Sequence, residues 1–188
     1  MNKKAPLIGF IIGVLLLTTV VSYYKFFLEK EETFLMDNPT EQSLNITLNG
    51  KKYFLAPKQT TYIEILDGKN TISAVSKEGD MVLKDTFFLA ENSRRCVVNP
   101  TLSDYYIFRR YYGYIKNIDS LYKAHKTVIG GKEYFGEIKI DKNLFINDFY
   151  FNIDQDFAKI VNKGDSIESR TKIFRKNQFL EFYRSNYE

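Results

Sequence analysis

Side chains that do chemistry are scarce in this chain. Its 188 residues include one histidine, His125, and one cysteine, Cys96. A Ser-His-Asp triad needs the histidine as its base, and a zinc site needs several histidine or cysteine ligands. Cys96 falls in an apolar run that we predict to be a strand, where a free cysteine is usually buried and inert. The sequence therefore predicts no catalytic residues, no metal and no cofactor.

One short segment approaches the pattern of a calcium loop. Residues 152–156, NIDQD, supply the first three ligand positions, but an EF-hand also needs Gly at the sixth position and Glu at the twelfth. Those two positions hold Phe157 and Lys163. We expect a solvated turn after a strand, with a calcium site of another kind as the alternative.

An aromatic stretch is the first candidate for a binding surface. Residues 105–114, YYIFRRYYGY, read as a strand, and alternation would place Tyr105, Arg109 and Tyr111 on one face. Tyr and Arg concentrate in the hot spots of protein interfaces, and an exposed row of them can also stack on sugars. The alternative is a central strand that has one side in the core.

Two tripeptides suit a protein exposed outside the cytoplasm. Asp119-Ser120-Leu121 and Asp165-Ser166-Ile167 resemble a sequon for bacterial O-glycosylation, which makes Ser120 and Ser166 candidate modification sites. Asp119 also suits the start of a helix, which is the alternative for the first of them.

The elements that must position these residues begin with an uncharged N-terminal run. Residues 5–24 contain no charged side chain and, as a helix, would span about 30 Å, the hydrocarbon thickness of a bilayer. Lys3 and Lys4 precede the run, and Tyr23 and Tyr24 suit an interfacial aromatic belt at its end. We predict an inner-membrane anchor over residues 1–27, with the N-terminus cytoplasmic and the rest of the chain periplasmic or extracellular.

Two features inside this run bear on partners and processing. Gly9 and Gly13 have the spacing that lets two membrane helices approach closely, so they are candidate helix-packing residues. Val20-Val21-Ser22 suits a cleavage site, so a signal peptide removed after Ser22 is the alternative to an anchor.

The charge balance argues against nucleic acid as a partner. The chain has 27 basic and 23 acidic residues, and two of the basic ones, Lys3 and Lys4, lie before the uncharged run. The remainder is close to neutral and shows no basic stripe.

A β-rich region follows a polar connection. Residues 28–42 are mostly polar and read as a stalk, after which short alternating runs are separated by turn residues about every 8 to 12 positions. Asn49-Gly50 and Asp67-Gly68 favour tight hairpin turns. We predict a small antiparallel, immunoglobulin-like β-sandwich over 43–114, with strands at Leu44–Leu48, Lys52–Ala56, Thr61–Leu66, Thr71–Val75, Met81–Leu89, Cys96–Asn99 and Tyr105–Tyr112.

The first part of this region resembles PEGA-type domains of bacterial envelope proteins. The resemblance covers residues 43–90 and rests on Leu48-Asn49-Gly50, Tyr53-x-Leu55-x-Pro57, Ile63-x-Ile65-x-x-Gly68, Asn70-Thr71-Ile72 and Asp85-Thr86-Phe87. Asn70 stands where the family commonly has His, and the tetrapeptide Pro-Glu-Gly-Ala is missing. The resemblance implies a small extracytoplasmic β-sandwich and no active site.

The pattern changes in residues 115–188. We predict a short amphipathic helix within 113–126, a hairpin at Gly130-Gly131, strands over 144–153 and 167–175, and a C-terminal helix capped by Asn177. This makes an α+β C-terminal domain, or an extension packed on the sandwich.

The function that these features favour is that of a non-enzymatic, membrane-anchored envelope protein. Its β-rich domain would contact other envelope proteins, as a subunit or accessory factor of a membrane assembly. The alternative is a secreted or surface carbohydrate-binding module released after Ser22.

Overall fold

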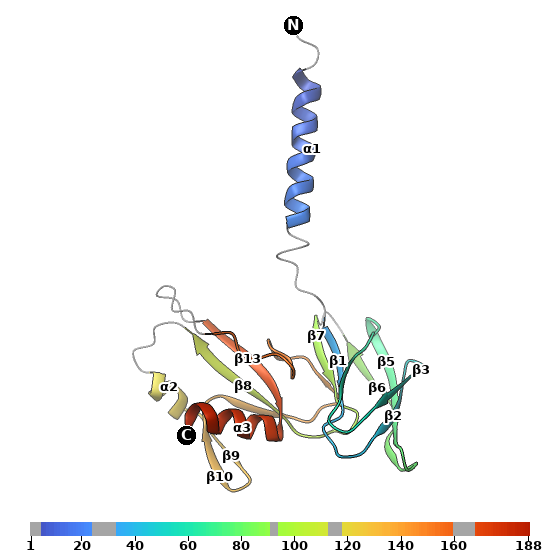
Figure 1. Cartoon of the computed structure of the whole chain (residues 1–188), viewed down its shortest axis with the longest axis vertical. Helices are drawn as coiled ribbons and strands as arrows, with labels where there is room; N and C mark the ends of the chain where they lie inside the picture. Colours follow the sequence, from blue (N-terminus) through green and yellow to red (C-terminus); the bar gives the residue numbers. More distant parts are fainter. Residues whose placement is uncertain (1–4, 24–32, 91–93, 113–117, 160–167) are drawn as a thin grey trace. The chain divides into compact units, whose positions relative to one another are not determined.

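The computed structural model describes residues 5–23, 33–90, 94–112, 118–159 and 168–188. The chain divides into two compact units, Met1–Glu32 and Thr33–Glu188. In the first unit, Ala5–Tyr23 forms the helix α1 (Figure 1). Among the described residues, no helix combines the length and the apolar character of a membrane crossing, so the span expected at residues 5–24 is not supported.

The second unit is mainly β, as predicted, and ends in a helix. Its first four-stranded sheet, sheet A, has the order β12-β7-β1-β4, and the second, sheet B, has the order β3-β2-β5-β6. The strands of sheet A are β1 (Thr33–Asp37), β4 (Thr60–Tyr62), β7 (Arg95–Val98) and β12 (Phe145–Ile146). Those of sheet B are β2 (Leu44–Leu48), β3 (Lys51–Leu55), β5 (Gly68–Ser76) and β6 (Met81–Ala90).

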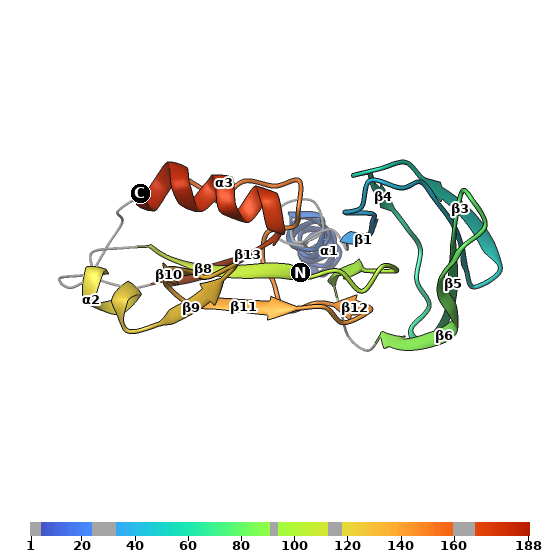
Figure 2. The ribbon, with the colours of Figure 1, turned by 90° about the horizontal axis from the view of Figure 1, so that it is seen from below.

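Beyond sheet A lies a third sheet, sheet C, with the order β11-β8-β13. Its strands are β8 (Tyr105–Tyr112), β11 (Ile138–Asp141) and β13 (Glu168–Arg175). The remaining elements are α2 (Ile118–Lys123), the hairpin of β9 (Lys126–Ile129) with β10 (Lys132–Phe135), and α3 (Lys176–Tyr187). Figure 2 shows α3 running along sheet C.

Strand alternation gives this unit three hydrophobic layers. In β1, Met36 points into the core shared with sheet B, while Leu35 points into the core shared with sheet C. In β8, Tyr105 joins that second core, and Tyr106 points to the opposite face, where α3 supplies Phe179. Because successive side chains of a strand point to opposite faces, sheets A and C are each buried on both sides.

Several local expectations are confirmed. The strands Leu44–Leu48 and Tyr105–Tyr112 have the predicted bounds. Asn49 and Gly50 both adopt positive φ, at 49° and 81°, in the two-residue turn between β2 and β3. That combination is the one a type I′ hairpin requires, which explains the residue types at this turn.

Other expectations are corrected. Residues 28–42, predicted to be a stalk, contain β1 in the middle of sheet A, and the part up to residue 32 lies outside the described residues. β1 and β7 pair in parallel, so the sandwich is not purely antiparallel. β8 lies in sheet C rather than in the sandwich, whereas β12, from the C-terminal part, joins sheet A. Strands therefore cross the expected boundary at residue 115.

The C-terminal helix is capped two residues earlier than predicted. Its N-cap is Arg175, whose backbone N–H donates to Oε1 of Gln178 at 3.1 Å. Asn177 lies inside the first turn and does not cap the helix. The run 144–153 yields only the two-residue strand Phe145–Ile146, so most of that predicted strand is irregular.

Candidate functional site

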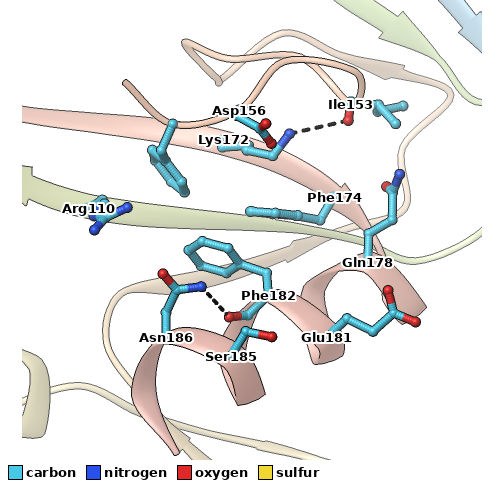
Figure 3. Close-up of a pocket in the computed structure, with 11 residues that line it drawn as sticks. Arg110, Ile153, Asp156, Lys172, Phe174, Gln178, Glu181, Phe182, Ser185 and Asn186 are labelled. Atoms are coloured by element: carbon cyan, nitrogen blue, oxygen red, sulfur yellow. Dashed lines mark hydrogen bonds between the residues drawn. The ribbon is translucent and has the colours of Figure 1, made fainter. Parts of the chain in front are cut away.

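A hollow of about 460 Å³ opens between α3, sheet C and the segment 152–157. Figure 3 shows the side chains that converge on it from these three elements. Its volume lies in the range of about 300–1,000 Å³ that is usual for small-molecule sites. Its lining combines phenylalanine rings with charged and amide side chains: Arg110, Ile153, Asp156, Phe157, Lys172, Phe174, Gln178, Glu181, Phe182, Ser185 and Asn186.

The apolar part of the lining is a cluster of three rings. Phe174 comes from β13 and Phe182 from α3, with ring centroids 4.9 Å apart. Phe157 packs against both, at 6.1 Å from Phe174 and 5.4 Å from Phe182. Phe174 is buried, whereas Phe157 and Phe182 are half-buried and keep part of their surface open to the hollow.

A buried lysine holds the segment 152–157 against sheet C. Lys172 of β13 lies two residues before Phe174, on the same face, and its ammonium stands 4.8 Å from the centroid of that ring. Its Nζ donates to the backbone oxygens of Asn152 at 3.0 Å and Ile153 at 3.2 Å, and also to that of Gln155. An ammonium has three donors, so all of them are used within the fold.

The electrostatics of Lys172 follow from this burial. Burial lowers the pKa of Lys172 to about 8, against the opposing effect of the Asp156 and Asp154 carboxylates. The segment considered as a calcium loop therefore wraps its carbonyl groups around a lysine of the chain itself. The predicted solvated turn is wrong for Asn152 and Ile153, which are buried.

The rim of the hollow carries charges of both signs. Asp156 is exposed beside Lys172, Glu181 is exposed on α3, and Arg110 is half-buried on β8, with its guanidinium carbon 5.7 Å from the centroid of the Phe157 ring. Within the described ranges, no hydrogen bond or ion pair holds these three charged groups. They are available to a ligand.

A second polar cluster is closed to ligands. The carboxylate of Asp37, at the end of β1, is fully buried and accepts from Nε of Arg175 at 2.9 Å and from Oγ1 of Thr60 at 2.8 Å. The Tyr105 hydroxyl and Nη2 of Arg175 also donate to it. Burial and the Asp37 carboxylate raise the pKa of Tyr105 well above its ordinary value. This cluster joins sheets A and C and leaves no free acceptor on Asp37.

The predicted aromatic surface is only partly exposed. Tyr105 is fully buried and donates to Asp37, so it does not belong to an exposed face. Arg109 and Tyr111 are half-buried, and both bind Glu137: Nε of Arg109 lies 2.8 Å from its Oε2, and the Tyr111 hydroxyl donates to the same oxygen at 2.9 Å. An uninterrupted aromatic row for stacking sugars is therefore absent from β8.

The other candidate residues lie apart from the hollow. Gly9 and Gly13 lie in α1, and a Cβ added at Gly13 would meet no atom within 4 Å. Ser120 is exposed in α2, whereas Ser166 lies outside the described residues. Cys96 is buried, and burial raises the pKa of its thiol to about 12, as expected of an inert cysteine. In the described part of the chain, no group of three or more His, Cys, Asp or Glu is placed to hold a metal.

Sequence reasoning missed the residues that make the hollow. Arg110, Lys172 and Glu181 carry no local signal in the sequence that would mark them as site residues. The only hints were the helical spacing of Phe179, Phe182 and Tyr183 and the conspicuous acids of residues 152–156.

Comparison with known proteins adds no relative. No family model, curated protein or solved structure matches the chain. The resemblance of residues 43–90 to PEGA-type domains therefore stays a prediction.

Proposed function

We propose that the chain is a non-enzymatic, membrane-anchored protein of the bacterial envelope that presents its Thr33–Glu188 unit outside the cytoplasm for contact with other envelope proteins. The sequence carries the membrane part of the proposal: twenty uncharged residues, 5–24, preceded by Lys3 and Lys4. Within this proposal, Gly9 and Gly13 are the face on which α1 meets another membrane helix.

The outer face of sheet B supports the proposed protein contact. Asn45 pairs with Phe54 on one side and Val75 on the other, and Val75 pairs with Met81, so this row crosses all four strands. Phe87 and Leu89 extend the face along β6. Their exposed fractions are high for large apolar side chains: 57% for Phe54, 64% for Met81, 57% for Phe87 and 54% for Leu89. Aromatic residues and Met are enriched in protein interfaces, which makes this face the single observation that favours a protein partner.

Topology can be tested with one added cysteine because the only native thiol, Cys96, is buried. Glu78 is exposed in the turn between β5 and β6. In intact cells with a permeable outer membrane, we expect a membrane-impermeant maleimide to label Glu78→Cys, whereas Lys3→Cys reacts only after lysis. The reverse pattern would invert the topology, and recovery of Glu78→Cys in the soluble fraction would exclude the anchor.

The same experiment separates the anchor from a released module. Loss of the Lys3→Cys reporter from the mature chain, with an N-terminal sequence that begins at Tyr23, would show cleavage after Ser22. A mature chain that keeps the reporter excludes release.

The contact face can be tested by crosslinking in cells. A photo-crosslinking residue at Phe54 or Phe87 should give discrete protein adducts. The matched control is the exposed Val128 on β9, away from sheet B, where we expect no such adducts. Equal adducts at all three positions would contradict a specific contact through sheet B. For the helix contact, replacing Gly9 and Gly13 by Ile should reduce recovery of the membrane partner in mild detergent while thermal unfolding stays unchanged.

A further inference from the structure

The charges around the α3 hollow restrict what can bind there. Asp156 and Glu181 contribute two negative charges, and Arg110 and Lys172 contribute two positive ones. An anion would meet the two carboxylates, and a cation would meet the guanidinium and the buried ammonium. Since Lys172 already donates to three backbone oxygens, it offers no hydrogen bond to an anion. The balance favours an uncharged, polar molecule.

The geometry of the polar groups narrows this class further. The free charged side chains of the lining end in planar groups with paired donors or acceptors, namely the carboxylates of Asp156 and Glu181 and the guanidinium of Arg110. Two adjacent hydroxyl groups on one molecule match such pairs, because each hydroxyl both donates and accepts. Phe157 and Phe182 line the same hollow and are half-buried, so the open part of each ring can contact the C–H bonds of a ligand.

We propose that this hollow binds a neutral saccharide. One sugar ring would lie with its C–H face against Phe157 and Phe182. Its hydroxyls would bond the carboxylates of Asp156 and Glu181 on either side and the guanidinium of Arg110 at the end. Figure 3 shows these three polar groups on different elements around the phenylalanine rings. Lys172 acts as a positioning residue that fixes the segment carrying Asp156 and Phe157.

This site differs from the aromatic row of β8 on which sugar binding was first expected. It also does not depend on the membrane topology or on the contact face of sheet B. Failure of the saccharide proposal would leave the proposed envelope function untouched. Failure of the envelope proposal would likewise leave the saccharide proposal untouched.

Binding can be measured by saturation-transfer NMR on the full-length chain, held in a zwitterionic detergent without a sugar headgroup. The probes are trisaccharides of glucose, mannose and N-acetylglucosamine at about 10 mM, where a site with a Kd of about 1 mM is mostly occupied. We expect at least one of them to bind, with the strongest saturation on the C–H protons of one ring face. A galacturonic acid trimer should bind more weakly, because its carboxylates would face Asp156 and Glu181.

Variants assign the binding to this hollow. Glu181→Gln and Asp156→Asn should each raise the Kd about tenfold, the usual cost of losing a charge-assisted hydrogen bond. The matched control is Asp85→Asn, since Asp85 is an exposed acid in a separate hollow on sheet B that also carries hydroxyl side chains. It should leave the Kd unchanged. No binding by any neutral trisaccharide would overturn the proposal, and so would binding that Asp85→Asn abolishes and Glu181→Gln preserves.

Discussion

Two groups of charged side chains in the Thr33–Glu188 unit differ in burial and in hydrogen bonding. Around Asp37 the carboxylate is fully buried, and its oxygens accept from Arg175, Tyr105 and Thr60. Around the α3 hollow, Asp156 and Glu181 are exposed and, among the described residues, make no hydrogen bond or ion pair. The first group is closed and joins two sheets, whereas the second is open and faces a hollow of about 460 Å³.

The difference teaches how to separate structural from recognition charges. A buried charge must have its bonding capacity filled by the fold, because an unfilled one costs several kcal/mol. An exposed charge beside an aromatic hollow costs the fold little and keeps its bonding capacity for a ligand. Lys172 is intermediate: it lines the hollow, yet its three donors are filled as those around Asp37 are.

The largest effect on stability is expected for the buried group around Asp37. Asp37→Ala should lower the free energy of unfolding by about 3–5 kcal/mol, because it leaves the Arg175 guanidinium partly buried without its partner. Urea unfolding followed by far-ultraviolet circular dichroism measures this loss. Asp104→Ala, a surface acid next to Tyr105 in the sequence, is the control and should change it by less than about 0.5 kcal/mol.

A double variant sharpens this prediction. Asp37→Leu combined with Arg175→Met removes both charges together, and part of the lost stability should return, since no buried charge then lacks a partner. A double variant that is as unstable as the sum of the two single variants would argue against the pairing.

Replacing Lys172, which lines the hollow but has all its donors filled, should have an effect of intermediate size on stability. Lys172→Met removes the ammonium donor from the backbone oxygens of Asn152, Ile153 and Gln155, of which that of Asn152 still accepts from the Gln155 N–H. We therefore expect a loss of about 2 kcal/mol in the free energy of unfolding. The control is Lys159→Met, an exposed lysine close by in the sequence, with a change below about 0.5 kcal/mol. Equal effects of the two variants would mean that Lys172 does not hold this segment.

The sequence predicted those parts of the fold that depend on near neighbours. The hairpin at Asn49-Gly50 was visible because only a few residue types tolerate two successive positive φ angles. β1 was not visible, since its five residues lie in a polar stretch and its parallel partner β7 is about sixty positions further on. The location of β8 failed for the same reason: its partners β11 and β13 both follow it in the sequence.

The candidate site was harder to predict than the fold. The hollow takes Arg110 from β8, Asp156 from an irregular segment, Lys172 from β13 and Glu181 from α3. In the sequence each resembles an ordinary polar residue of its own segment, and only the tertiary structure brings them together. Nothing in the local pattern could have distinguished Lys172, which is buried, from Lys159, which is exposed.

The pH dependence of stability should come from Lys172. Its pKa is about 8 in the folded chain and ordinarily 10.5, so between these values the unfolded chain binds the proton that the folded chain has lost. Unfolding then takes up a proton, and the free energy of unfolding of the wild type rises relative to that of Lys172→Met, by about 1 kcal/mol at pH 9. Below pH 8 both states are protonated, so the difference in stability between the two proteins is smallest there and widens as the pH rises. Urea titrations from pH 7 to 9.5 measure this difference. A constant difference would mean that the hydrogen bonds to the three carbonyl groups cancel the effect of burial on the pKa of Lys172.

The smallest effects on stability are expected at the open group, where Glu181→Gln should change the free energy of unfolding by less than about 0.5 kcal/mol. Asp156→Asn should be equally mild at pH 7, but it removes a carboxylate that raises the pKa of Lys172. In this variant, the pH at which stability begins to rise should therefore move below that of the wild type, while Glu181→Gln leaves it in place. Urea titrations of both variants from pH 6 to pH 9.5 measure the free energy of unfolding and the pH at which it begins to rise. A loss above about 1 kcal/mol for Glu181→Gln would place that carboxylate with the structural charges around Asp37 and remove it from the set available to a ligand.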